Sequence, residues 1–211
     1  MSLKVAVIYE DHTNDQYVVG PALTALFSHL GKPKARLQTV TNPRLQGLSS
    51  LIQNLCPIIG RYSAAADIVI VVVDGDCKDG RRGTENRLQR LTDLIASCPE
   101  GSDKTLVVIA LQEVEVWALW GQRDRIKADW NTIRAECHPK ERFFNDLLTP
   151  EDSKAPGAGR LRLMAKSLEH GWPSLKAGCS ELRVLEDEVR GLLGMPAEGG
   201  RRPPAGPALS S

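Results

Sequence analysis

The sequence feature that most constrains the fold is an uninterrupted apolar run, IVIVVV, at residues 68–73. A strand with one face in water alternates apolar and polar residues, whereas a strand covered on both faces does not need to. The run is therefore typical of a central strand in a parallel sheet. Similar runs at residues 3–9 and 105–111 predict two more buried strands.

The segments between these runs show helical spacing of their apolar residues. Helices are expected at residues 16–30, 42–66 (interrupted at Pro57) and 87–96. The polar residues 11–15 predict a turn, and residues 35–40 predict a second, edge-like strand. Strands that alternate with helices predict a parallel sheet with right-handed crossovers.

After the third buried run, the pattern becomes helical. Helices are expected at residues 113–120, 125–135, 140–148, 160–170 and 180–193. We expect them to pack on the sheet as a helical C-terminal extension, so that residues 1–194 form one α/β domain with a parallel sheet flanked by helices. Residues 195–211 are rich in Pro, Gly and Ala and predict a disordered tail.

Charge and cysteine content limit the class of protein. The formal net charge is +1, so any contact with nucleic acid must come from a local basic patch. We find neither a signal-peptide pattern nor the run of about 20 apolar residues that a membrane helix needs. The five cysteines are scattered and form no C-x-x-C pair, which favours reduced thiols. These features predict a cytoplasmic protein that has no membrane partner.

Acidic residues follow each of the three buried strands. Glu10 follows the first strand, Asp74 and Asp76 follow the central one, and Glu113 and Glu115 follow the third. In an open parallel sheet, ligands bind beyond the carboxyl ends of the strands. Residues two apart in an extended segment point to the same side, so Asp74 and Asp76 can act together.

Two carboxylates held together repel each other, and a divalent cation relieves that repulsion. Mg²⁺ suits such a place because it prefers oxygen ligands and often needs only one or two carboxylates. We therefore predict that Asp74, Asp76 and Glu10 bind Mg²⁺ or Mn²⁺. The alternative is that these acids belong to ordinary solvated loops.

The order of these motifs resembles the Toprim domain of topoisomerases, primases and OLD-type nucleases. A strand ending in Glu10 is followed by a helix and by a strand ending in Asp-x-Asp at residues 74–76. The segment QEVEVW at residues 112–117 is similar to one uncharacterised Toprim-like family related to the OLD-type nucleases. The residues around Pro139 and Ser153 match later motifs of that family.

The resemblance implies a Toprim-like sheet and a role for each acid. Glu10 would be the general acid or base, and Asp74 and Asp76 would hold the magnesium ion. Glu113 would complete the catalytic pocket. If a helix begins at Glu113, then Glu113 and Glu115 cannot share a face, and only one of them points inward.

The loop after the first strand departs from the family pattern. Asp11 stands where relatives have glycine, while Thr13 matches. Asn14 occupies the position of an expected acid, and Asp15 follows it. We expect that the loop can still supply an acid.

Basic residues near these motifs are candidates for binding the phosphates of nucleic acid. Arg81 and Arg82 follow the Asp-x-Asp turn, together with Arg87 and Arg90. Lys140, Lys154 and Arg160 lie in the helical half. Positive charge beside a metal site stabilises the developing charge on a phosphodiester. We select Arg81, Arg82, Lys140 and Lys154 as the predicted contacts.

The sequence thus predicts a magnesium-dependent phosphodiester hydrolase that acts on DNA or RNA. Related nucleases often work with an ATPase, and this chain has no phosphate-binding loop, so a separate ATPase subunit and a role in defence are implied. One alternative is a non-catalytic regulatory subunit that binds metal or nucleic acid. Another is a haloacid dehalogenase-type phosphatase, although its Asp-x-Asp normally lies on the first strand and precedes threonine.

Overall fold

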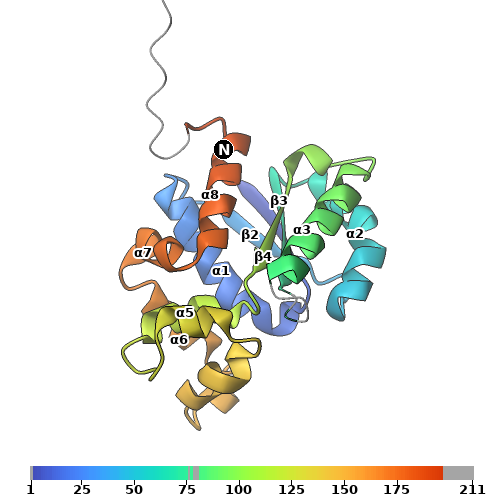
Figure 1. The fold of residues 1–211 in the computed structure, drawn as a ribbon. Helices are drawn as coiled ribbons and strands as arrows, with labels where there is room; N and C mark the ends of the chain where they lie inside the picture. Colours follow the sequence, from blue (N-terminus) through green and yellow to red (C-terminus); the bar gives the residue numbers. More distant parts are fainter. Residues whose placement is uncertain (1, 76, 78–80, 197–211) are drawn as a thin grey trace, which may run out of the picture.

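The computed structural model describes residues 2–75, 77 and 81–196, except for the side chains of Arg81 and Arg82. Its centre is an all-parallel sheet with the strand order β2-β1-β3-β4 (Figure 1). The strands are β1 (Lys4–Tyr9), β2 (Arg36–Thr39), β3 (Ile68–Asp74) and β4 (Thr105–Ala110). The predicted α/β class, with a parallel sheet flanked by helices, is confirmed.

Helices cover both faces of the sheet and extend past its carboxyl end. The α-helices are α1 (His12–His29), α2 (Gly47–Ser63), α3 (Arg81–Ala96), α4 (Glu115–Leu119), α5 (Trp130–Ala135), α6 (Arg160–Ser167), α7 (Gly171–Gly178) and α8 (Ser180–Leu192). Shorter helical turns are η1 (Ser102–Lys104), η2 (Trp120–Gln122), η3 (Lys140–Phe144), η4 (Asn145–Leu147) and η5 (Asp152–Lys154). No helix in the described ranges is long and apolar enough to cross a membrane.

The alternating side chains of the strands divide the core into two layers. Val7 and Ile70, on one face, pack with α1 and with the later helices up to α8. Ile8 and Val71, on the other face, pack with α2 and α3. Figure 1 shows α2 and α3 on one side of the sheet and α1, α7 and α8 on the other. The central strand is therefore buried on both faces, as its apolar run predicts.

The helical half of the chain shares the core of the sheet. Figure 1 shows α5 and α6 past the carboxyl ends of the strands.

A buried carboxylate, Glu186 in α8, accepts hydrogen bonds from Trp172 Nε1 (2.5 Å), Lys176 Nζ (2.8 Å) and Arg190 Nε (2.9 Å). Burial alone would raise the pKa of Glu186, but these bonds outweigh it and lower the pKa to about 2. This network fastens α7 to α8.

Several helix boundaries differ from the sequence prediction. The predicted turn at residues 11–15 is wrong, because α1 begins at His12 and the Asp11 side chain caps it by accepting a hydrogen bond from Thr13 N (2.9 Å). Helix α3 begins at Arg81 instead of residue 87, and α2 continues through Pro57. Residues 197–211, most of the predicted tail, lie outside the described residues.

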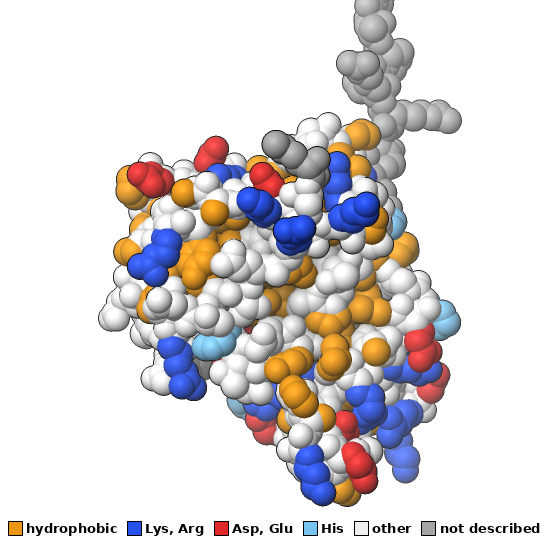
Figure 2. Space-filling model, turned by 180° about the vertical axis from the view of Figure 1, so that it is seen from behind, with side chains coloured by type: hydrophobic (Ala, Val, Ile, Leu, Met, Phe, Trp, Pro, Cys, Tyr) orange, Lys and Arg blue, Asp and Glu red, His pale blue; other side chains and the backbone are white. Residues whose placement is uncertain are grey.

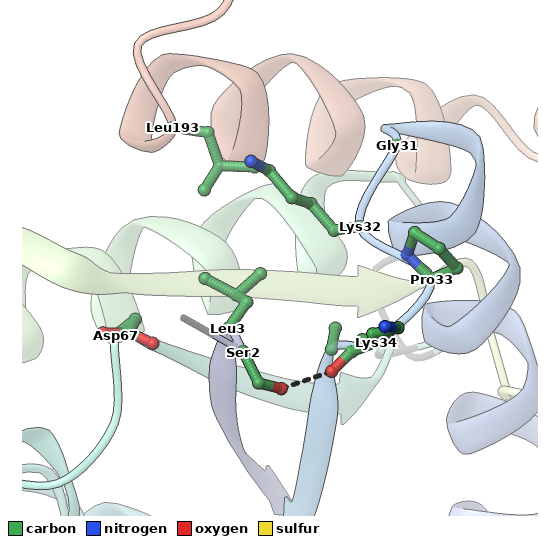
Figure 3. A pocket seen from close by; sticks show the side chains of 9 residues that line it. Ser2, Leu3, Gly31, Lys32, Pro33, Lys34, Asp67 and Leu193 are labelled. Atoms are coloured by element: carbon green, nitrogen blue, oxygen red, sulfur yellow. Dashed lines mark hydrogen bonds between the residues drawn. The ribbon is translucent and has the colours of Figure 1, made fainter.

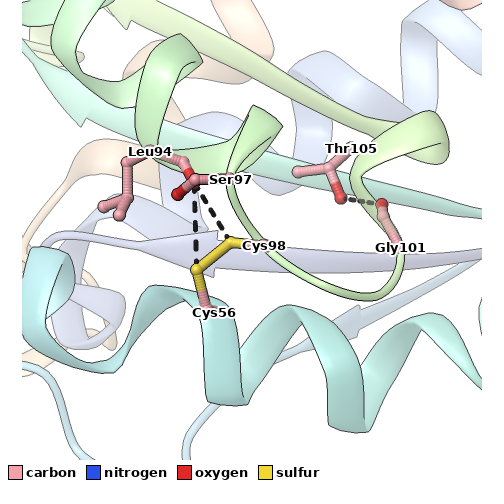
Figure 4. The surroundings of a disulfide bond; sticks show 6 residues. All are labelled: Cys56, Leu94, Ser97, Cys98, Gly101 and Thr105. Atoms are coloured by element: carbon pink, nitrogen blue, oxygen red, sulfur yellow. Dashed lines mark hydrogen bonds between the residues drawn. A yellow bond between two sulfur atoms is a disulfide. The ribbon is translucent and has the colours of Figure 1, made fainter.

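Disulfides correct the prediction of reduced thiols. Cys56 is bonded to Cys98, and Cys77 to Cys137, with Cα–Cα distances of 5.1 and 5.3 Å. Figure 4 shows the first bond linking α2 to the residues that follow α3. Cys179 is free and buried. Scattered spacing in the sequence did not reveal these pairs, because the cysteines meet only through the packing of distant elements.

Candidate functional site

The carboxyl ends of β1 and β3 bring Glu10 and Asp74 together. The two strands are parallel neighbours in which Tyr9 pairs with Val72, and Glu10 N donates to Val72 O (3.3 Å). Asp74 is the last residue of β3. Glu10 and Asp74 therefore lie at the carboxyl ends of adjacent parallel strands. The third predicted ligand, Asp76, lies outside the described residues.

Asp74 is enclosed by protein and by other acids. Its Oδ1 accepts a hydrogen bond from Val114 N (2.9 Å), which fixes the carboxylate against the segment after β4. Burial raises the pKa of Asp74 well above its ordinary value, and the charges of Asp15, Glu115 and Glu10 raise it further. A carboxyl group in this position needs a positive partner to stay ionised.

Asp15 is a third acid of this group. It follows Asn14, which stands at the position where the family pattern has an acid. It lies in the first turn of α1, is 7% exposed, and accepts a hydrogen bond from Asp11 N (3.2 Å). Burial raises its pKa to about 7, with a further contribution from the charge of Glu115. The early start of α1 turns this side chain toward the strand ends.

Glu115 is the acid of the third strand end that faces Asp15 and Asp74. It is buried and paired with Arg160, whose Nη2 and Nε lie 2.5 and 3.0 Å from Glu115 Oε1. Glu113 lies apart from them, and its Oε2 accepts a hydrogen bond from Lys140 N (2.9 Å). Burial and then the charge of Glu115 raise the pKa of Glu113, against the Lys140 hydrogen bond, which lowers it.

Of the basic residues, Arg87 and Arg160 reach the acidic group. Arg87 Nη1 donates to Asp74 O (2.5 Å) and Gly75 O (3.3 Å). Among the predicted phosphate contacts, Lys140 reaches Glu113 through its backbone, whereas Lys154 is exposed in η5 and no described contact joins it to these acids. The side chains of Arg81 and Arg82, at the start of α3, lie outside the described part of the chain.

Glu10 combines a raised pKa with a buried carboxylate oxygen that has no hydrogen-bond partner among the described residues. Burial raises its pKa, while the charge of Arg87 and the N–H groups of Leu48 and Asp74 lower it. The oxygen without a partner is Oε2. Leu48 and Arg87 also line a pocket of about 170 Å³ between α2 and α3, whose other lining residues include Arg90. The pocket therefore shares Leu48 and Arg87 with the surroundings of Glu10.

The described residues contain no ready-made cage of three His, Cys, Asp or Glu side chains for a metal ion. Mg²⁺ does not need one, because it keeps several waters and is often held by one or two carboxylates. The unpartnered oxygen of Glu10 and the half-buried Asp74, which is surrounded by other acids, are suited to that mode of binding. Zinc, which prefers nitrogen and sulfur ligands, finds no such set there.

A second pocket, of about 490 Å³, lies at the amino-terminal end of the sheet (Figure 3). Lys32, Lys34 and Asp67 line it together with apolar residues, and Asp67 Oδ2 accepts a hydrogen bond from Lys4 N (2.7 Å). Figure 2 shows several Lys and Arg side chains toward the upper end of the rear face. This pocket is at the opposite end of the strands from the acids and is no part of the candidate site.

No family model matches the chain, and no curated protein or solved structure matches it either. The site therefore has to be interpreted from its own chemistry. It combines buried carboxylates with raised pKa values, two arginines and an adjoining pocket. Such a set can hold a divalent cation, bind an anion beside it and move a proton.

Proposed function

We propose that the chain is a magnesium- or manganese-dependent phosphodiester hydrolase that acts on nucleic acid, of the Toprim-like type suggested by its motifs. One observation carries the proposal: Glu10, Asp15, Asp74 and Glu115 converge at the carboxyl end of the sheet, with the pKa of Asp74 well above its ordinary value. Acids that repel each other in a buried place favour the binding of a cation.

Asp74 and Glu10 would hold the cation, which when bound polarises the phosphate and lowers the pKa of a water molecule. Burial raises the pKa of Glu10 above its ordinary value, which favours its use as a proton acceptor over an ordinary exposed carboxylate. In the reaction, a water oxygen would bond to phosphorus as the bond to the leaving oxygen breaks. Glu10 would take one proton from the attacking water, and the leaving oxygen would take up a proton from solvent. Arg160 keeps Glu115 in place and is not needed as a phosphate contact.

The choice of a phosphodiester substrate is supported by Arg87 and Arg90, which line the pocket between α2 and α3, and by the charge of Arg87, which acts on Glu10. Their positive charge suits a phosphate next to the metal. Nucleic acid, a separate ATPase subunit and a role in defence remain part of the proposal through the motif resemblance. A cytoplasmic location remains a prediction of the sequence, and the two disulfides stand against it because they are typical of oxidising compartments.

The test is cleavage of single- and double-stranded DNA and RNA by the purified chain with Mg²⁺, Mn²⁺ or chelator. We expect Glu10→Gln to slow cleavage by about 10²-fold or more, the usual contribution of a positioned acid or base. Asp74→Asn should abolish the metal binding measured by calorimetry. Asp67→Asn, at the opposite end of the sheet, is the matched control and should keep both properties.

Two results would change the assignment. A wild-type protein that binds the metal but cleaves no nucleic acid, alone or with an added ATPase, would be a binding subunit instead of an enzyme. If a Glu10→Gln variant cleaves as fast as the wild type, the protein is still an enzyme, but Glu10 is not the residue that takes the proton.

A further inference from the structure

Three buried oxygen atoms near the acidic group have no hydrogen-bond partner among the described residues. They are Glu10 Oε2, Thr84 Oγ1 and Gln112 Oε1. A buried polar group left without a partner costs about 1–3 kcal/mol, so such atoms are uncommon and need an explanation. Glu10 follows β1, Thr84 lies in the first turn of α3 after β3, and Gln112 follows β4. All three belong to segments that leave the carboxyl ends of adjacent strands.

Gly75 shows that two of these segments meet. A Cβ atom added at Gly75 would lie 2.8 Å from Gln112 N, 2.8 Å from Ala110 O and 3.1 Å from Thr84 Oγ1. Only glycine therefore fits between the Thr84 hydroxyl and the backbone of Gln112. Because Gly75 directly follows Asp74, the Thr84 hydroxyl and the Gln112 backbone lie at the carboxyl end of β3, where Asp74 is the last residue.

The backbone of Gln112 is held in an unusual conformation. Its φ is 70°, in the left-handed region that a residue with a long side chain seldom adopts, and the residue is only 8% exposed. Such strain persists where the surrounding structure fixes a residue, and it is concentrated at functional sites. Here it holds an amide-bearing side chain in the buried space after β4.

The chemistry of the three atoms indicates what they bind. A carboxylate oxygen and an amide carbonyl oxygen only accept hydrogen bonds, and a hydroxyl oxygen can accept as well. A partner that all three atoms share would therefore be a donor. Phosphate oxygens are acceptors and do not fit, whereas the waters around Mg²⁺ are donors, and Mg²⁺ keeps several of them when it binds to proteins.

We propose that Thr84 and Gln112 accept hydrogen bonds from waters of the divalent cation held by Asp74 and Glu10, an inference that rests on the proposed function. The two residues orient the hydrated ion instead of ligating it directly. Groups in this outer position commonly change metal affinity by about 10- to 100-fold. The site would thus be completed by neutral oxygen atoms, which add no charge to an already acidic place.

The experiment compares the variants Thr84→Val and Gln112→Met with the wild type. Calorimetry measures the affinity for Mn²⁺ and Mg²⁺, and thermal unfolding measures the stability of the metal-free protein. Both changes keep the approximate size of the side chain and remove the acceptor. We expect the affinity to fall about tenfold in each. Metal-free stability should not fall, because no bond within the protein is lost.

Thr105→Val is the matched control. The Thr105 hydroxyl donates to Gly101 O (2.6 Å) at the amino end of β4, far along the strand from the site. This variant should lose some metal-free stability and keep full metal affinity. Thr84→Val, in contrast, should lose metal affinity and keep its metal-free stability.

The outcomes separate this inference from the proposed function. If the wild type binds neither metal, both are wrong. If the wild type binds Mn²⁺ or Mg²⁺, and both variants bind equally well, only the role of Thr84 and Gln112 is wrong. A metal-free destabilisation of Thr84→Val as large as that of Thr105→Val would also overturn it, because the hydroxyl would then have a partner within the protein.

Discussion

Asp15 links the stability of the metal-free protein to pH. Its pKa is about 7 in the folded chain, against the ordinary value of 3.8. Between these values, the folded state binds more protons than the unfolded state. The contribution of Asp15 is therefore fully present below about pH 4 and is lost as the pH rises through 7, by at most about 1.4 kcal/mol per pH unit.

Asp15→Asn should remove this part of the pH dependence. The measurement is chemical unfolding of the metal-free protein at several pH values between 5 and 7.5. Over this range, the free energy of unfolding should fall less in Asp15→Asn than in the wild type. Asp124→Asn, at an exposed position, serves as the control and should keep the wild-type slope. Equal slopes in Asp15→Asn and the wild type would mean that Asp15 titrates normally in the fold.

At the scale of single residues, the sequence predicts the site residues that lie at the end of a buried strand or directly after it. Glu10 and Asp74 were identified because their strands are plain in the sequence. The choice of Glu113 over Glu115 was uncertain, because it depends on where α4 begins. Thr84 and Gln112 carried no signal, since only the meeting of β3 and β4 segments at Gly75 reveals them.

At the scale of elements, the disulfide between Cys56 and Cys98 should stabilise the layer formed by α2 and α3. It closes a separation of 42 residues in the sequence. A loop of that length corresponds to about 4 kcal/mol in the chain-entropy model. We expect Cys56→Ser with Cys98→Ser to lower the free energy of unfolding by an amount of this order, measured by denaturant titration without reductant.

Mass spectrometry of the unreduced protein is the companion measurement. A peptide that joins Cys56 to Cys98 should be found in wild-type digests, while Cys179 should be the one thiol left for alkylation, and only after unfolding. Free Cys56 and Cys98 in protein taken directly from cells would support the reducing compartment that the sequence predicts. In that case the stability difference should disappear as well.

The elements differ in how well the sequence predicts them. The predicted ends of the buried strands agree with the observed ends within one or two residues. A continuous run of β-branched residues is typical of a strand that is covered on both faces. Helix starts were less certain: the α1 cap depends on one side-chain hydrogen bond from Thr13 N to Asp11. In the second half, α4 (Glu115–Leu119) and α5 (Trp130–Ala135) are shorter than the helices that the apolar spacing predicts.

At the scale of the whole molecule, the helical half closes the end of the sheet where the acids lie. Arg160 from α6 neutralises Glu115, and Lys140 from η3 binds Glu113. The bond between Cys77 and Cys137 ties the segment after β3 to the segment before η3. The site is therefore assembled from both halves of the chain, and neither half contains it alone.

This arrangement predicts that the two halves unfold together. The four tryptophans, which all lie in the helical half, are Trp117, Trp120, Trp130 and Trp172. Their fluorescence reports on that half, while far-ultraviolet circular dichroism reports on the whole chain. Because one buried cluster runs from β1 to α8, both signals should give the same denaturation midpoint. Ile70→Val, in the sheet face of that cluster, should cost about 0.5–1.5 kcal/mol and shift both midpoints equally. A shift in circular dichroism without a shift in fluorescence would show that the helical half is a separate domain.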